Sequence, residues 1–333
     1  SVSPPLLTVP TGVMSPSSED RTSLSTYRFA CAFTGALLIG WLVPWLKDAF
    51  SGPSGNPAVG FRNTMAVFAV VSVAMFFYTF AKTRERVAPP AAQKSSFGRD
   101  VRDLGGNVPW LILFFVAFLN LTNVGLRSGS GIYYFKYCVG NEAALGTFNL
   151  VGFLCFIAGA LSTKLFLKFF PRRELMIALT CINAIAMAAF YFVTPQSMVT
   201  LYVLNVIGQS AAGPTPAIVW SLYADTADYG EWKFNRRATG LVFSATVFAQ
   251  KVGLAIGSAM LGWLLSYFGF VANAAQSPRA LHGITVLFSL LPALFGGLSG
   301  LAIFLYNLDE PTVKQIERDL AERKLQEPAP AGA

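Results

Sequence analysis

The sequence carries little charge for its length. Only 13% of its 333 residues are charged, whereas a soluble domain usually contains about 25%. Hydrophobic residues make up 54% of the chain, and the mean hydropathy is +0.52. A single soluble core could not bury so much apolar surface. The shortage of charge therefore excludes an ordinary soluble domain and predicts an all-α membrane protein.

Residue types that bind metals or perform catalysis are also scarce. The cysteines, Cys31, Cys138, Cys155 and Cys181, show no CxxC or CxxH spacing, so they indicate neither a disulfide framework nor a zinc site. His282 is the only histidine, and a single histidine at a span end is typical of a structural residue. No HExxH motif, Ser/His pair or pair of intramembrane aspartates occurs. We therefore expect no enzyme, no metal site and no organic cofactor.

Long apolar runs recur along the whole chain. Each is close to the roughly 20 residues that an α-helix needs to cross a bilayer. A shorter apolar piece at 2–13 covers only about 18 Å as a helix. We therefore expect about eight full transmembrane helices plus one partial helix, with the full spans at 26–48, 60–81, 108–136, 142–168, 174–193, 197–222, 239–268 and 281–307.

The net charge of +8 comes from basic residues whose positions match the expected membrane topology. Most of the 25 Lys and Arg residues lie at alternate span ends, and only Lys47, Arg62, Lys136 and Arg279 lie toward the other side. An excess of Lys and Arg is typical of cytoplasmic loops. The basic balance therefore predicts a cytoplasmic C-terminus and argues against nucleic acid as a partner.

A polar stretch divides the chain. Residues 81–109, AKTRERVAPPAAQKSSFGRDVRDLGGNVP, have the composition of a surface linker. Two six-helix halves joined by such a linker are the plan of major facilitator transporters. We therefore predict a major facilitator-type helical bundle that lacks roughly the first three and a half of twelve helices. Its parts would be a remnant of the N-terminal half (1–81), a cytoplasmic linker (82–107), a complete six-helix C-terminal half (108–307) and a cytoplasmic tail (308–333).

The tail contains one further pattern. Val313, Ile316 and Leu320 lie on one helical face, which predicts an amphipathic helix on the cytoplasmic surface.

Lys251 lies deep in the predicted span 239–268. By helical rise it is about 18 Å from the start of the span, too far from either interface for its side chain to snorkel. An ionised lysine there costs about 2.5 kcal/mol or more unless it is paired or hydrated. All 17 acidic residues lie in loops, at span ends or in the tail. Either Lys251 is deprotonated or, as we favour, its partner lies on helices outside this chain.

Acidic residues gather in SLYADTADYGEWKFNRRATGLVFS (221–244). Asp225 and Asp228 share a helix face at the end of the span 197–222, where the helix dipole opposes negative charge. Basic side chains should neutralise the charges of these two aspartates, and the candidates are Lys233, Arg236, Arg237 and Arg21. One interpretation is a salt-bridged latch between the two halves of a carrier, made when the cytoplasmic side is shut and broken when it opens. The alternative is a solvated loop with incidental ion pairs.

Other polar or helix-breaking residues interrupt the spans. Pro214 and Pro216 predict a kinked helix, which either flanks a substrate path or only packs. Asn120 could join helices or bind sugar hydroxyls. Arg127 lies near the outer interface, where we expect it to snorkel, and Tyr134 with its neighbouring tyrosines fits an aromatic belt there.

Three segments together resemble the glycoside–pentoside–hexuronide:cation symporters of the major facilitator superfamily: EDRTSLSTYRF (19–29), GIYYFKYCVG (131–140) and ADTADYGEWKFNRRATGLVFSATVFAQKVG (224–253). The similarity extends over essentially the whole chain. It implies sugar uptake coupled to Na⁺ or H⁺. It also places Lys251 near the sugar and the cation and makes Arg28 a sugar contact.

The implied gate consists of Arg21, Asp225, Asp228 and Arg237. The cation site of the family would lie largely on helices outside this chain.

The sequence therefore predicts a secondary active transporter that carries a sugar or glycoside by alternating access. We expect a monomer in a bacterial inner membrane, with Arg28, Asn120 and Lys251 binding substrate. Two alternatives stay open: a carrier of lysolipids or other amphiphiles with the same fold, and a sensor or scaffold that does not transport.

Overall fold

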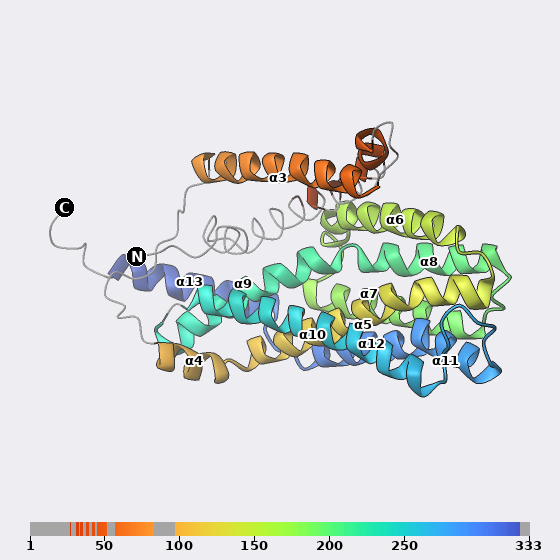
Figure 1. The fold of residues 1–333 in the computed structure, drawn as a ribbon. Coiled ribbons are helices and arrows are strands. Elements are labelled where there is room, and N and C mark those ends of the chain that lie inside the picture. Colours follow the sequence, from red (N-terminus) through yellow and green to blue (C-terminus); the bar gives the residue numbers. More distant parts are fainter. Residues whose placement is uncertain are drawn as a thin grey trace.

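A computed structural model describes Tyr27, parts of 31–51, and residues 57–82, 97–236 and 238–326. The predicted site residues Arg21, Arg28 and Arg237, and the apolar piece at 2–13, lie outside the described residues. The regular structure that follows residue 56 in the described part is helical throughout (Figure 1). Its elements are α3 (Pro57–Lys82), α4 (Phe97–Gly105), α5 (Val108–Tyr133), the π-helix η1 (Tyr134–Val139), α6 (Ala144–Phe166), α7 (Arg172–Ala189), the 3₁₀-helix η2 (Phe190–Phe192), α8 (Met198–Ala212), α9 (Thr215–Phe234), α10 (Thr239–Tyr267), α11 (Pro278–Phe288), α12 (Leu290–Phe304) and α13 (Glu310–Gln326).

Six helical segments of the described chain are long and apolar enough to cross a membrane, namely 58–81, 108–139, 144–166, 172–192, 239–267 and 278–304. They confirm the all-α membrane class. The predicted span 197–222 instead forms two helices, α8 and α9, which meet at Gly213 and Pro214. Proline removes a helical hydrogen bond and its ring clashes with the preceding turn, so the kink predicted here is confirmed. The span 26–48 lies mostly outside the described residues, and the division at the linker and the number of missing helices stay predictions.

Glycines allow α5 and α10 to pack with their backbones close together. A Cβ atom added to Gly253 would lie 2.3 Å from the carbonyl oxygen of Phe118, and one added to Gly257 would lie 2.3 Å from that of Thr122. Small residues permit such an approach between membrane helices. Because both contacts advance in the same order along the two helices, α5 and α10 run in parallel.

We expect Gly257→Ala to lower the stability of the protein by about 1–3 kcal/mol, because the added methyl group forces the two helices apart. Gly262→Ala is the matched control, since a Cβ there has nothing within 4 Å in the described chain. Thermal unfolding in detergent measures both variants. Equal losses from the two substitutions would contradict the close seam.

Two large apolar cores and a small third one, around Trp110, fill the described bundle. The first includes Tyr223 and Phe243 and lies toward the end of the bundle that carries α4 and α13, which we call the charged end (Figure 1). The second, around Phe148 and Phe288, lies toward the opposite end. The amphipathic helix predicted in the tail is confirmed as α13. Val313, Ile316 and Leu320 form its apolar face, which is buried in the first core against α9.

Candidate functional site

The charged end is built around α9. Asp225, Asp228 and Glu231 expose only 2%, 8% and 6% of their surface. The sequence predicted the two aspartates at a helix end, but α9 continues to Phe234. The helix dipole acts mainly within the last turn, so it is not the main cost of placing acids here. Burial of the charge is the larger cost, and it requires a partner.

Arg172 supplies that partner from the first turn of α7. Its Nη1 atom donates to Oδ2 of Asp225 at 2.8 Å, and it lies 3.4 Å from Oγ of Ser221. The side chain of Arg172 is 11% exposed and that of Asp225 is 0% exposed. A charge-assisted hydrogen bond so shielded from water is stronger than a surface ion pair. The carboxylate of Glu310, at the start of α13, lies 4.0 Å from Nε of Arg172 on the more open side.

The predicted gate residues are only partly described. Arg21 and Arg237 lie outside the described residues, so their role stays a prediction. Arg236, expected beside the aspartates, forms its ion pairs with α4 instead. Arg172 was not among the predicted partners of the aspartates, although it belongs to the PRR triplet at 171–173 on the predicted cytoplasmic side.

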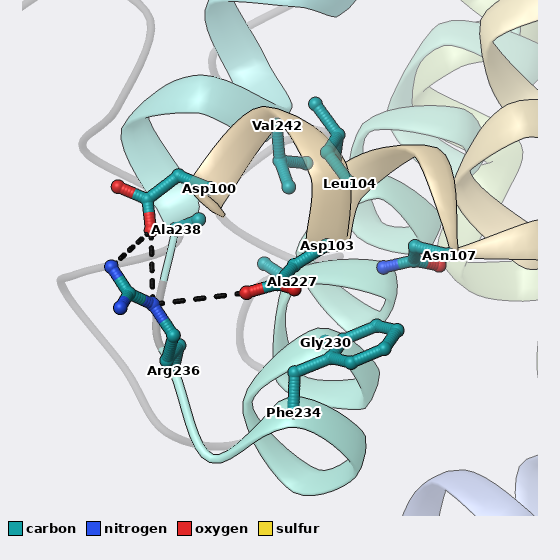
Figure 2. Close-up of a pocket in the computed structure, with 10 residues that line it drawn as sticks. All are labelled: Asp100, Asp103, Leu104, Asn107, Ala227, Gly230, Phe234, Arg236, Ala238 and Val242. Carbon is teal, nitrogen blue, oxygen red and sulfur yellow. Dashed lines mark hydrogen bonds and ion pairs between the residues drawn. The ribbon is translucent and has the colours of Figure 1, made fainter. Parts of the chain in front are cut away.

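Arg236 holds the linker helix α4 (Figure 2). Its Nη2 atom lies 2.6 Å from Oδ1 of Asp100, and its Nε atom lies 3.7 Å from Oδ2 of Asp103. The two aspartates are one turn apart and therefore share a face of α4. Together with Arg236 they border a cavity of about 20 Å³, which is room for roughly one water molecule. The predicted surface linker thus contains a helix that is bound to the α9–α10 connection.

We expect the double variant Asp100→Asn/Asp103→Asn to release α4 without unfolding the bundle. These ion pairs are partly exposed, with 17–28% of each side chain accessible, so their loss should cost about 1 kcal/mol or less. Chymotrypsin should then cleave the linker helix faster while the melting temperature hardly changes. Arg99→Gln, on the exposed face of α4, is the control and should not change the cleavage rate.

The tail helix is joined to the end of α9 by hydrogen bonds. Nε1 of Trp232 donates to Oδ2 of Asp319 at 2.8 Å. In return, Nη1 of Arg323 donates to the carbonyl oxygen of Trp232 at 3.1 Å and to Oδ1 of Asn235 at 2.8 Å. Asn235 adopts a left-handed conformation with φ of 52° and ends α9. α13 is therefore fixed to the same α9–α10 connection as α4.

Asp309 caps the start of α13. The backbone N–H of Thr312 donates to its Oδ1 atom at 3.0 Å. Hydrogen bonds from Thr312, first from its hydroxyl and then from its backbone, hold the pKa of Asp309 below the usual value. The ionised cap therefore stabilises the helix above the usual pKa, and its contribution is lost as the pH falls through the lowered one.

Lys251 lies on the face of α10 opposite the glycine seam. It is two residues from Gly253, which is about 200° around the helix, and its side chain is exposed. In the described part of the chain it has no ion pair or hydrogen bond. Ser244, Ser258 and Gly262 lie within about 20° of it and are also exposed. These residues form a narrow stripe, which exposed Phe248 and Leu254 border on either side. Small and polar residues in such a stripe are typical of a helix contact or a water-filled path rather than of a lipid-facing surface.

Asn120 lies on α5 and is half-buried. Because Phe118 faces Gly253 across the seam, Asn120 is about one helical turn from the level of Lys251 along the bundle. The roles of both residues stay predictions, and Arg28 lies outside the described residues. Among the residues that the structure describes, no group of three His, Cys, Asp or Glu side chains could hold a metal ion. The site of the coupling cation likewise stays a prediction.

Arg127 does not lie as its sequence position predicts. Its side chain does not snorkel but turns into the second core, where its guanidinium carbon lies 3.6 Å from the ring centre of Phe288 and 4.3 Å from that of Phe190. Tyr134, expected in an aromatic belt, is fully buried and stacks on Phe288 with ring centres 4.3 Å apart. Aromatic faces attract a cation, which explains how a charged side chain fits this apolar core.

Comparison with known proteins fits this membrane bundle. Residues 8–310 match the family model described as MFS/sugar transport protein. The chain is 32% identical over 317 residues to the inner membrane symporter YicJ of Escherichia coli (strain K12), covering 94% of the chain and 68% of that relative. It is 31% identical over 313 residues to the isoprimeverose transporter of Lactiplantibacillus pentosus, covering 93% and 65%. It is 27% identical over 329 residues to the glucuronide carrier protein homolog of Escherichia coli (strain K12), covering 96% and 70%.

The helical bundle and these matches define an integral membrane transporter of the major facilitator class. The chain belongs to the MFS/sugar transport protein family. The predicted resemblance to the glycoside–pentoside–hexuronide:cation symporters is confirmed, since relatives of the chain are named symporters and sugar transporters. The chain spans about two thirds of the length of these relatives.

Proposed function

We propose that the protein is a secondary active transporter that carries a sugar or glycoside together with Na⁺ or H⁺ by alternating access. The family supports the solute class, and the names of the relatives support cation coupling. The observation that carries the mechanism is the buried pair of Arg172 and Asp225, which lies at the same end as the contacts of α4 and α13. This pair lies within the C-terminal half and holds the Asp225 carboxylate in place. An ion pair of the aspartates with Arg21 of the other half would close this end in one state and break in the other.

The proposal assigns a place to each predicted site residue. Asp225 and Asp228 belong to the gate at the charged end, together with Arg21 and Arg237. Lys251, Asn120 and Arg28 bind substrate farther along the bundle. The stripe of small and polar residues around Lys251 on α10 supports this assignment. The protein would act as a monomeric carrier, not an enzyme, in a bacterial inner membrane with its C-terminus in the cytoplasm.

Counterflow in liposomes tests the proposal. The purified protein is reconstituted with a trapped glycoside, and uptake of a labelled glycoside panel is measured with and without Na⁺ and at two external pH values. We expect exchange of at least one glycoside and a stimulation by Na⁺ or by lower external pH. Binding without exchange would instead favour a sensor. Competition by lysolipid but by no glycoside would favour an amphiphile carrier.

A further inference from the structure

The last membrane span is interrupted between α11 and α12. Ser289 separates the two helices with φ of −120° and ψ of −76°. In a continuous helix, the carbonyl oxygen of Phe288 would accept a hydrogen bond from the backbone N–H of residue 292. That residue is Pro292, which has no N–H and whose ring crowds the carbonyl four residues earlier. The sequence therefore deprives one identifiable carbonyl group, that of Phe288, of its helical partner.

Arg127 donates a hydrogen bond to this same oxygen. Its Nη1 atom lies 2.5 Å from the carbonyl oxygen of Phe288, across from α5. Phe288 and Phe190 each expose only 2% of their surface, so water has little access to the contact. A buried carbonyl without a donor is unfavourable, and nearly all such groups in proteins have a partner. The guanidinium group thus supplies the donor that Pro292 lacks.

The surroundings of Arg127 explain why this donor is an arginine. Within the described residues no carboxylate forms an ion pair with it. Its guanidinium carbon instead lies near the rings of Phe288 and Phe190, which are nearly perpendicular to each other. A guanidinium group is planar, so it can lie over an aromatic ring and still donate from its edge. An ammonium group has no such plane and is more strongly hydrated. Both the stacking and the direction of the hydrogen bond therefore favour arginine.

We propose that Arg127 is a positioning residue that replaces the backbone donor missing at Pro292 and thereby fixes the bend between α11 and α12 against α5. One side chain then joins α5, the end of α7 and the last span at the end of the bundle opposite the charged end. A second link acts nearby, where Sγ of Cys138 in η1 lies 3.8 Å from Oγ1 of Thr285 in α11. The inference does not depend on which solute is carried.

A double-mutant cycle on the reconstituted protein tests the inference. Arg127→Met removes the donor, and we expect it to lower the melting temperature by about 5 °C. Pro292→Ala restores a backbone N–H four residues after Phe288, so the carbonyl can regain a helical partner. In the Pro292→Ala background, Arg127→Met should therefore lower the melting temperature by less than half as much. An equal loss in both backgrounds would overturn the proposal.

Two further variants separate hydrogen bonding from packing. Phe190→Leu removes one of the two ring contacts of Arg127 but leaves the hydrogen bond to the carbonyl group. Its effect on the melting temperature should therefore be the same with Pro292 as in the Pro292→Ala background. Arg127→Lys keeps a donor and should fold even where Arg127→Met does not. In Arg127→Met, hydrogen–deuterium exchange should become faster at residues 289–293 than in the wild type, whereas Arg127→Lys should stay closer to the wild type. Unchanged exchange in Arg127→Met would contradict the positioning role.

Discussion

Asp225→Ala is expected to lower the stability of the protein by about 3–5 kcal/mol, because it leaves Arg172 shielded from water without its carboxylate. The pair is almost fully buried, at 11% and 0% side-chain exposure, so water cannot replace the lost partner. Glu310 lies 4.0 Å from Nε of Arg172 and is too exposed to compensate fully. Chemical unfolding in detergent measures the loss, and Arg172→Met should produce a loss of similar size.

The double variant Arg172→Met/Asp225→Leu provides the control. Replacing a whole buried ion pair by apolar residues is often close to neutral, so the double variant should be more stable than either single one. If it is no more stable than Asp225→Ala, the two residues do not act as a pair. A transport assay then distinguishes a role of the pair in gating from a role in packing alone. A folded double variant should still exchange solute but should fail to accumulate it against a gradient, because it lacks the Asp225 carboxylate that the proposed ion pair with Arg21 needs to hold the charged end shut.

The transmembrane spans could be predicted from the sequence because a helix that crosses the bilayer must be apolar over a nearly fixed length. The runs at 108–136 and 239–268 differ from their helices by only a few residues, and Pro214 marked the break between α8 and α9. The linker was less predictable. The charges of the linker indicated only a surface segment. The structure shows that Asp100 and Asp103 share one face of α4, because Arg236 forms ion pairs with both.

Two contacts of charged side chains could not be predicted, because they depend on how distant helices pack. Asp225 has three basic residues close behind it in the sequence, and the structure adds Arg172, from the start of another helix, at 2.8 Å. Arg127 illustrates the same limit. Its position near a span end favours snorkelling, and only the placement of Phe190 and Phe288 on other helices turns its side chain into the core.

Lys251→Ala is expected to reduce transport at least about tenfold, equivalent to roughly 1.4 kcal/mol, while leaving stability within about 0.5 kcal/mol of the wild type. The two effects separate because Lys251 is exposed on α10 and has no hydrogen bond or ion pair within the described chain, so the bundle loses nothing when it is removed. Its charge lies at a depth where a cation is retained only for a partner, a solute or water. Counterflow and thermal unfolding on the same preparation measure both quantities.

Lys136→Ala is the matched control for that experiment. Lys136 is also an exposed lysine, but it lies in η1 at the far end of the bundle, where its Nζ atom lies 3.1 Å from Oδ1 of Asn273. Its loss should leave both exchange and stability nearly unchanged. Lys251→Arg keeps the charge and should retain part of the exchange. Full exchange in Lys251→Ala would remove the residue from the substrate path. A loss of stability equal to the loss of transport would instead assign Lys251 to the packing of α10.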